Sequence, residues 1–214
     1  MSIENLNSTQ TRRAYDAVAS RYDSLFKKEL DNKPYDRKLL KRFSEKLSHG
    51  SLVYDMGCGP CGHVGRYIQR RGHRVVGVDI SPECIRLASL NNPGFSFELM
   101  DMANLQVDSN TVDGIVSFYS IIHTPKRQIG KIFDEYNRVL KDDGTLLVVV
   151  KGGEGEGRID SLLDLPVPIH FSHFNETELA AYIRESGFQL DFIKSRKPYD
   201  FEINSVRVYA IGSK

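Results

Sequence analysis

Short apolar runs alternate with longer amphipathic stretches through the middle of the chain. The apolar runs have the length of buried strands, and they predict strands over Leu52–Asp55, Val75–Asp79, Phe95–Met100, Val112–Phe118 and Leu146–Lys151. The stretches between them gather apolar residues on one helical face and predict helices over Val64–Arg71, Pro82–Asn91 and Gly130–Leu140. Because strand and helix alternate, we expect a doubly wound α/β fold whose core strands are parallel.

The C-terminal part of the chain departs from this alternation. Asn175, followed three residues later by Glu178, predicts a capped helix that ends before Gly187. Two final strands, Phe188–Lys194 and Val206–Ile211, are joined by a short connection. We therefore expect them to pair antiparallel as a β-hairpin at the sheet edge, which completes seven strands.

We expect one domain over residues 1–214, because one α/β unit with a few added elements accounts for this length. Residues 8–47 predict two helices that break near Asp31–Pro34, so a helical extension precedes the first strand. A long loop rich in glycine, acids and proline follows the fifth strand, and we expect it to act as a lid. The predicted parts are the N-terminal extension 1–48, the α/β core 49–151, the lid loop 152–174 and the C-terminal helix and hairpin 175–214.

Composition narrows the classes of function. The formal net charge is +1, and the basic residues are interleaved with acids, so a nucleic-acid partner is disfavoured. The count of three cysteines favours a reducing compartment over a disulfide framework. The charged N-terminal segment predicts neither a signal peptide nor a membrane anchor, so we expect a cytoplasmic protein without a membrane partner. The sequence leaves the oligomeric state open.

The strongest chemical signal is the segment Val53–Gly62, where a predicted strand runs into Gly57, Gly59 and Gly62 and then into a helix. Glycines let the backbone approach a ligand closely, and the helix N-terminus offers free N–H groups. Asp79 closes the second predicted strand, where a carboxylate can accept both hydroxyls of a ribose. These features predict a cofactor site at this turn.

Two alternatives compete for the glycine loop. Its glycines also match the G-x-G-x-x-G fingerprint of NAD-type oxidoreductases, but Asp55 would repel a pyrophosphate, whereas an ammonium group would be attracted. Cys58 and Cys61 form a C-x-x-C, yet the chain has no Trp and offers no second pair of zinc ligands. The redox and metal interpretations are therefore disfavoured, and no metal is expected.

The segment Val53–Tyr67 resembles the first motif of the class I S-adenosylmethionine-dependent methyltransferases, whose strand ends in an acid ahead of a D-x-G-x-G-x-G loop. Farther along, Val112–His123 is similar to the strand-four motif of that family, and Phe133–Val149 to the region after it. The resemblance implies a Rossmann-like, mostly parallel seven-stranded sheet with helices on both faces. It also implies S-adenosyl-L-methionine as cofactor, a small molecule as methyl acceptor, and a cofactor-binding role for residues 49–151.

The same resemblance implies which residues bind the cofactor. Asp55 and the backbone of residues 57–59 should hold the methionine portion, and Asp79 the ribose. The family's third glycine falls at Cys61, whereas this chain has Gly62 one residue later, and the sequence leaves open which fills the turn. The expected cofactor-binding residues are Tyr15, Tyr22, Asp55, Met56, Gly57, Cys58, Gly59, Asp79, Ile80, Asp101 and Met102 (on the adenine), and Ser117 and Phe118 (on the reaction face).

The N-terminal segment resembles the Tyr-Asp pairs that cap the cofactor in small-molecule members, including ubiquinone and menaquinone C-methyltransferases. Tyr15 and Tyr22 lie seven residues apart on one helical face, so we expect them to close over the cofactor, with packing onto the core as the alternative. His123 is the expected general base and Tyr119 the second catalytic candidate, while a turn-capping role for His123 is the alternative. The acceptor, the choice among O-, N- and C-methylation, and a non-catalytic cofactor-binding role stay open.

Overall fold

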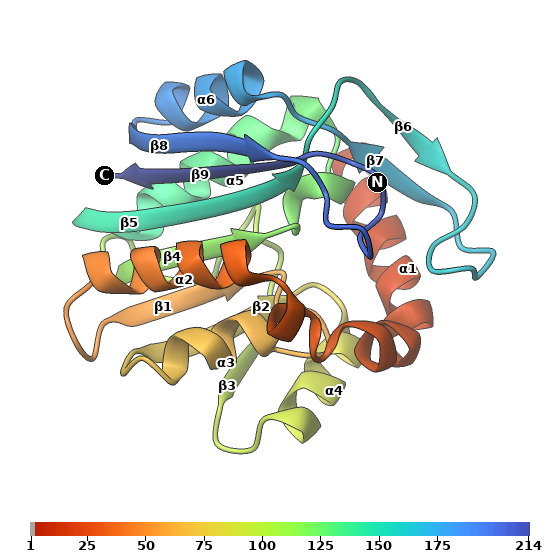
Figure 1. Cartoon of the computed structure of the whole chain (residues 1–214), viewed down its shortest axis with the longest axis horizontal. Helices are drawn as coiled ribbons and strands as arrows, with labels where there is room; N and C mark the ends of the chain where they lie inside the picture. Colours follow the sequence, from red (N-terminus) through yellow and green to blue (C-terminus); the bar gives the residue numbers. More distant parts are fainter. Residues whose placement is uncertain (1–2) are drawn as a thin grey trace.

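The computed structural model describes residues 3–214. Seven strands form one sheet in the order β3-β2-β1-β4-β5-β9-β8 (Figure 1). Neighbours among β1 to β5 are parallel, whereas β9 pairs antiparallel with both β5 and β8. The strands are β1 Leu52–Met56, β2 Arg74–Asp79, β3 Ser96–Leu99, β4 Val112–Phe118, β5 Leu140–Lys151, β8 Gln189–Arg196 and β9 Arg207–Ser213. The predicted Rossmann-like sheet is confirmed.

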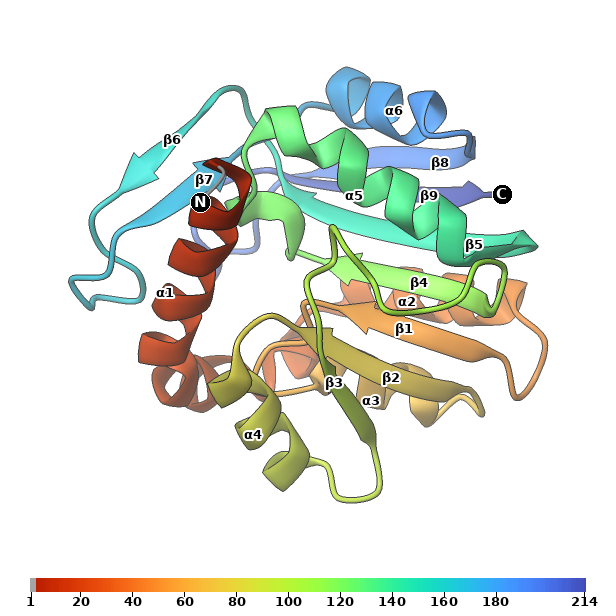
Figure 2. The same cartoon turned by 180° about the vertical axis from the view of Figure 1, so that it is seen from behind.

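Helices cover both faces of this sheet (Figures 1 and 2). Successive side chains of a strand point to opposite faces, so Ile115 and Val148 pack in the cluster that includes α5 and α6, whereas Val116 and Leu147 pack in the cluster that includes α2 and α3. Two hydrophobic layers thus fix the sheet. The helices are α1 Ile3–Phe26, α2 Pro34–Lys46, α3 His63–Gln69, α4 Pro82–Asn91, α5 Lys126–Val139 and α6 Glu176–Glu185, with short 3-10 helices η1 Glu29–Asn32 and η2 Ile121–His123.

Most predicted ends of the elements lie close to the observed ones, but the predicted starts of α5 and β5 were wrong by several residues. The side chain of Asn175 accepts the backbone N–H of Glu178, so the predicted N-cap of α6 is confirmed. The C-terminal hairpin is confirmed as well, but β9 lies between β5 and β8, so β8 alone forms the edge. Strand β5 begins at Leu140 rather than at Leu146, directly after α5.

The segment predicted as an irregular lid loop contains a β-hairpin, so that part of the prediction was wrong. Strand β6, Glu156–Ile159, pairs antiparallel with β7, Ile169–Ser172, as a separate two-stranded sheet. The sequence of β6 contains glycine and charged residues, which are unfavourable in strands, so its local pattern does not predict a strand. The pairing is supported instead by contacts of β7 with the turn after β4: Ser172 Oγ donates to the carbonyl of Thr124 at 2.7 Å.

Helix α1 lies outside the layered core and runs past α4 and β7 (Figure 2). Its Asp16 carboxylate accepts a hydrogen bond of 2.6 Å from the hydroxyl of Ser81, the N-cap of α4. Two turns further along, Asp23 accepts a hydrogen bond of 2.8 Å from the side-chain amide of Asn91. These contacts hold the predicted extension against the first and last turns of α4.

The glycine loop after β1 makes a close backbone approach that can be tested. Gly57 has φ of +69°, and a Cβ there would lie 2.4 Å from Cβ of Ser120. We expect Gly57→Ala to lose the roughly 1–2 kcal/mol of a left-handed alanine plus about 1–3 kcal/mol of overpacking, measured by denaturant unfolding. The control is Gly50→Ala, because Gly50 has φ of +81° but no atom within 4 Å of its would-be Cβ. Equal losses in the two variants would show that the Ser120 contact carries no strain.

Candidate active site

The candidate site lies at the edge where the parallel strands end. The chain reverses its direction of winding between β1 and β4, and ligands of open α/β sheets bind at such a switch point. The glycine loop after β1, Asp79 at the end of β2, Asp101 after β3 and residues 117–123 around the end of β4 meet at this edge. Helix α1 and the β6–β7 hairpin lie across it (Figure 2).

Asp79 fastens the glycine loop to the end of β2. One carboxylate oxygen accepts the N–H of Gly59 at 2.9 Å, and the other accepts the N–H of Ser81 at 2.9 Å. The residue is 8% exposed, and burial raises its pKa to about 6. A carboxylate offers about four lone-pair positions, so acceptor capacity remains for the hydroxyls of a ribose, the role predicted for it.

Asp55, at the end of β1, lies beneath the same loop. Its Oδ2 accepts the N–H of Gly65 in the first turn of α3 at 2.9 Å. Burial raises its pKa to about 7, and the charge of Asp79 adds to this, while His63 and the Gly65 N–H act in the opposite direction. A cationic group bound nearby would favour the charged carboxylate, so the structure is compatible with the predicted ammonium contact.

A cavity of about 440 Å³ opens where β2 and β3 end. Ile80 and Met100 give it apolar walls, and Asp101 gives it an acceptor, a combination that fits a flat base with an exocyclic amine. Met102 does not line this cavity; its sulfur accepts a hydrogen bond of 3.4 Å from the hydroxyl of Tyr136. The lining residues are Ser8, Thr9, Arg12, Ile80, Leu99, Met100, Asp101, Asn104 and Gln106.

The turn of the glycine loop settles the register that the sequence left open. Gly62 has φ of +55° and is the N-cap of α3, and a Cβ there would lie 2.9 Å from the side-chain amide of Asn92. Gly62 rather than Cys61 therefore fills the left-handed position. Cys58 and Cys61 are free and buried, and burial raises the pKa of both thiols, which makes them poor nucleophiles.

Tyr15 and Tyr22 face the site from α1, with ring centroids 6.2 Å apart. The edge of the Tyr22 ring lies 3.8 Å from the position of a Cβ on Gly59. The Tyr15 ring lies 5.6 Å from the ring of His123, and burial and then the charge of Asp79 raise the pKa of its hydroxyl. Tyr15 thus lies near both Asp79 and His123, and its contact with the cofactor stays a prediction.

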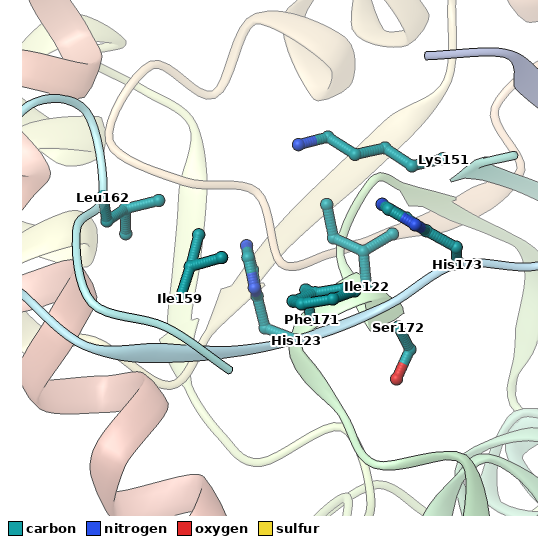
Figure 3. A pocket seen from close by; sticks show the side chains of 8 residues that line it. All are labelled: Ile122, His123, Lys151, Ile159, Leu162, Phe171, Ser172 and His173. Atoms are coloured by element: carbon teal, nitrogen blue, oxygen red, sulfur yellow. The ribbon is translucent and has the colours of Figure 1, made fainter. Parts of the chain in front are cut away.

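His123, in η2, lies on a second cavity of about 190 Å³ (Figure 3). Its Nδ1 lies 2.6 Å from the carbonyl oxygen of His170 in β7; because a carbonyl only accepts, Nδ1 carries the proton and Nε2 is the acceptor. Burial lowers the pKa of the ring to about 4, so it is neutral at pH 7. The lining residues are Ile122, His123, Lys151, Ile159, Leu162, Phe171, Ser172 and His173.

Four other predicted residues lie away from both cavities. Ser117 shares a hydrogen bond of 2.6 Å with Ser120, and Phe118 packs in the core cluster on the α2 side. Met56 is fully buried in the opposite core cluster. The Tyr119 ring lies between Lys33 and Arg207, 5.4 and 5.9 Å from its centroid, rather than beside His123, so its catalytic role stays a prediction.

Three residues that the sequence reasoning did not single out belong to the site. Lys151 ends β5 on the wall of the second cavity, and Asp16 holds α1 to the first turn of α4. Met100 lines the first cavity one residue before Asp101. A signal for Lys151 was present, because a lone charge closes an otherwise apolar strand at the ligand-binding edge.

These features define the class of protein. The left-handed glycine loop, two buried carboxylates at the ends of β1 and β2, and an apolar cavity beside Asp101 fit the methionine, ribose and adenine portions of S-adenosylmethionine. A family model described as a methyltransferase domain matches residues 53–144. The chain is thus similar to the class I S-adenosylmethionine-dependent methyltransferases and has their fold.

The comparisons with known proteins agree with this class. Human probable tRNA methyltransferase 9B is 28% identical over 167 residues, 75% of this chain and 35% of that protein. Phosphoethanolamine N-methyltransferase of Plasmodium falciparum is 27% identical over 154 residues, 68% of this chain and 58% of that enzyme. The chain thus spans less than two thirds of these curated relatives.

Solved structures share the fold at low identity. The 1,6-didemethyltoxoflavin-N1-methyltransferase of Burkholderia thailandensis, with bound 1,6-didemethyltoxoflavin and S-adenosylhomocysteine, has a TM-score of 0.75 at 18% identity. The match covers 100% of this chain and 91% of that one. A methyltransferase of Methanosarcina mazei has a TM-score of 0.72 at 19% identity, over 82% of this chain and 96% of that one.

The raised pKa of Asp55 predicts a pH dependence of cofactor binding. Asp55 is partly protonated near pH 7 in the free protein. A ligand ammonium favours the charged carboxylate, so below this pKa Asp55 must lose its proton when the ligand binds. The free-energy cost of that proton loss weakens binding at low pH. We expect affinity for S-adenosylhomocysteine to rise about tenfold from pH 6 to pH 8, measured by calorimetry. Asp55→Asn should bind more weakly and remove most of this slope. A flat affinity in the native chain would exclude Asp55 as the ammonium partner.

Proposed function

We propose that this protein transfers the methyl group of S-adenosylmethionine to a small molecule bound in the second cavity. The observation that carries the proposal is the position of Tyr15, which is close enough to Asp79 for that charge to raise its pKa and lies 5.6 Å from His123. One ring therefore separates the proposed cofactor site from the half-open second cavity. That arrangement suits a reaction between two bound small molecules.

The chain's own contribution would be to position the reactants and exclude water. Bound at the glycine loop, the cofactor supplies an electrophilic methyl group on a sulfonium. Asp79 and Asp101 would orient the ribose and the adenine, and Asp55 would hold the ammonium. Tyr15 and Tyr22 would close over the loop from α1. Fixing two reactants in line near ~3 Å can supply much of the acceleration of such a transfer.

His123 would act on the acceptor from the wall of the second cavity. Because its Nδ1 proton is bound to the His170 carbonyl, its Nε2 can accept a hydrogen bond from an O–H or N–H of the acceptor. A base with a pKa of about 4 removes a proton only from a group that becomes strongly acidic during the transfer. His123 is therefore best suited to an oxygen or nitrogen acceptor that loses its proton as the new bond forms.

The small volume of the second cavity, about 190 Å³, favours a small molecule over a nucleic acid, although one relative carries tRNA in its name. Ile159, Leu162 and Phe171 from the β6–β7 segment cover the cavity, and a folded RNA would have to displace them. Within residues 3–214 no helix is long and apolar enough to cross a membrane. Three buried free thiols support the proposed cytoplasmic location. Turnover of any acceptor would exclude a purely non-catalytic role.

Calorimetry tests the proposed cofactor site. We expect S-adenosylhomocysteine to bind saturably and NAD not to bind, since Asp55 favours an ammonium over a pyrophosphate. Asp79→Ala should weaken binding by about 2 kcal/mol, roughly thirtyfold, because it removes charge-assisted hydrogen bonds to the ribose. The control is Asp113→Ala, which also removes a carboxylate that accepts a backbone N–H, from Leu52, but at the start of β4. Similar affinities of the two folded variants for S-adenosylhomocysteine would show that Asp79 does not bind the ribose.

Hydrogen exchange tests the proposed cover over the site. Helix α1 and the lid meet through the ion pair of Arg21 and Asp164 at 2.6 Å, which is exposed and worth little by itself. We expect S-adenosylhomocysteine to slow exchange in residues 8–26 and, with an acceptor, in residues 152–174. Helix α6 serves as the internal control. Unchanged rates in both segments would assign them a structural role alone.

A further inference from the structure

Lys151 extends into the second cavity from the end of β5. The strand is buried from Thr145 to Val150, so its last residue emerges at the ligand-binding edge of the sheet. Figure 3 shows the Lys151 side chain extended across the cavity, with its ammonium and the His123 ring directed into the same space. Lys151 is therefore the one charged residue of β5 at the ligand-binding edge, and it places a cation on the cavity wall.

The ammonium of Lys151 has no counter-ion within the described residues. No hydrogen bond or ion pair joins it to any of the side chains that the structure describes, those of residues 7–214. Burial lowers its pKa, and Arg207 and Lys33 lower it further, while Glu29 acts in the opposite direction. Glu29 is itself bound to Lys33 and lies 3.5 Å from His63. A half-buried cation is costly unless a partner is supplied.

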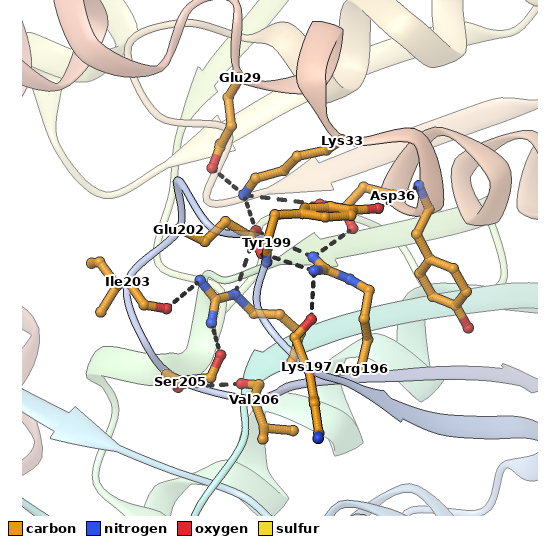
Figure 4. Close-up of polar contacts among 12 residues, drawn as sticks. Glu29, Lys33, Asp36, Arg196, Lys197, Tyr199, Glu202, Ile203, Ser205 and Val206 are labelled. Carbon is orange, nitrogen blue, oxygen red and sulfur yellow. Dashed lines mark hydrogen bonds and ion pairs between the residues drawn. The ribbon is translucent and has the colours of Figure 1, made fainter.

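A neighbouring group of six charged residues, termed the charge cluster, is balanced internally (Figure 4). Lys33 pairs with Glu202 at 2.9 Å, and Glu202 also pairs with Arg196 at 2.8 Å. The cluster contains three cations and three carboxylates, so it leaves no negative charge for Lys151. Its members are Glu29, Lys33, Asp36, Arg196, Glu202 and Arg207.

The rest of the cavity wall is neutral and mostly apolar. His123 is uncharged at pH 7, and burial lowers the pKa of His173 as well. No carboxylate is among the described lining residues. The apolar part of the lining consists of Ile122, Ile159, Leu162 and Phe171.

We infer that the methyl acceptor is a compact apolar molecule that carries one carboxylate, which pairs with Lys151 in the second cavity. The inference rests on the proposed function, because it assigns a substrate class to the same site. One negative charge neutralises one ammonium, and the apolar wall packs against the remainder of the molecule. A phosphate monoester is disfavoured, since its second charge would be buried among apolar side chains without a partner.

Matched probes test this assignment in the native chain loaded with S-adenosylhomocysteine. Benzoate and indole-3-carboxylate are titrated beside benzamide and indole-3-carboxamide, which keep the shape and remove the charge. We expect the carboxylates to bind at least tenfold more tightly than the amides. Lys151→Met should abolish this preference and change S-adenosylhomocysteine affinity less than twofold, whereas Lys151→Arg should retain part of it. Lys194→Met, at an exposed lysine of β8, is the control and should behave as the native chain does.

Several outcomes would overturn the assignment. Equal binding of acids and amides, or a preference that survives in Lys151→Met, would remove Lys151 from acceptor recognition. If none of the four probes binds to a chain that still binds S-adenosylhomocysteine, the carboxylate assignment is wrong and the proposed cofactor site still stands. Tighter binding of phenyl phosphate than of benzoate would reassign the anion. If S-adenosylhomocysteine binds neither the native chain nor the variants, the proposed function itself is contradicted.

Discussion

The buried carboxylate of Asp79 holds the ligand-binding edge of the sheet together. Its two oxygens accept backbone N–H groups from Gly59 in the glycine loop and from Ser81 at the start of α4. The hydroxyl of Ser81 in turn donates to Asp16 on α1. Asp79 therefore fixes the loops that follow β1 and β2 relative to each other, and Ser81 ties the N-terminal helix α1 to them. Hydrogen bonds from backbone N–H groups offset part of the hydration that the buried carboxylate loses, although burial still raises its pKa.

The other end of the edge is organised by the charge cluster rather than by one carboxylate. Lys33, before α2, and Arg196, at the end of β8, both bind Glu202 from the β8–β9 connection. Tyr209 adds a hydrogen bond of 2.6 Å to Asp36. These contacts join the N-terminal helices to the last two strands. Because the cluster is neutral as a unit, Lys151 on the adjoining cavity wall keeps an uncompensated charge.

Helix α1 joins the two halves of the site. Its Asp16 is tied to α4 beside Asp79, while Arg21 pairs with Asp164 in the segment 152–174. Between them, the Tyr15 ring lies 5.6 Å from the His123 ring. The glycine-loop side and the second cavity are therefore connected through one helix. This gives a physical reason for the helical extension to precede the sheet.

The sequence by itself determined the sheet and its ligand-binding edge. Parallel strands of an α/β unit are buried on both faces, so each appears as a continuous apolar run, and Asp55 and Asp79 stand out where β1 and β2 end. The N-cap at Asn175 and the C-terminal hairpin were predictable because their signals are local.

Only the tertiary structure decided the rest. The pairing of β6 with β7 depends on contacts with the turn after β4, which no local pattern encodes. Gly62 was identified as the turn glycine only through its dihedral angle and its closeness to Asn92. The sequence could place a lysine at the end of β5 but could not show that it lacks a counter-ion, because Glu29 and Glu202 come from distant segments and pair with Lys33 only in the folded chain. The charge of the second cavity is thus a property of the fold.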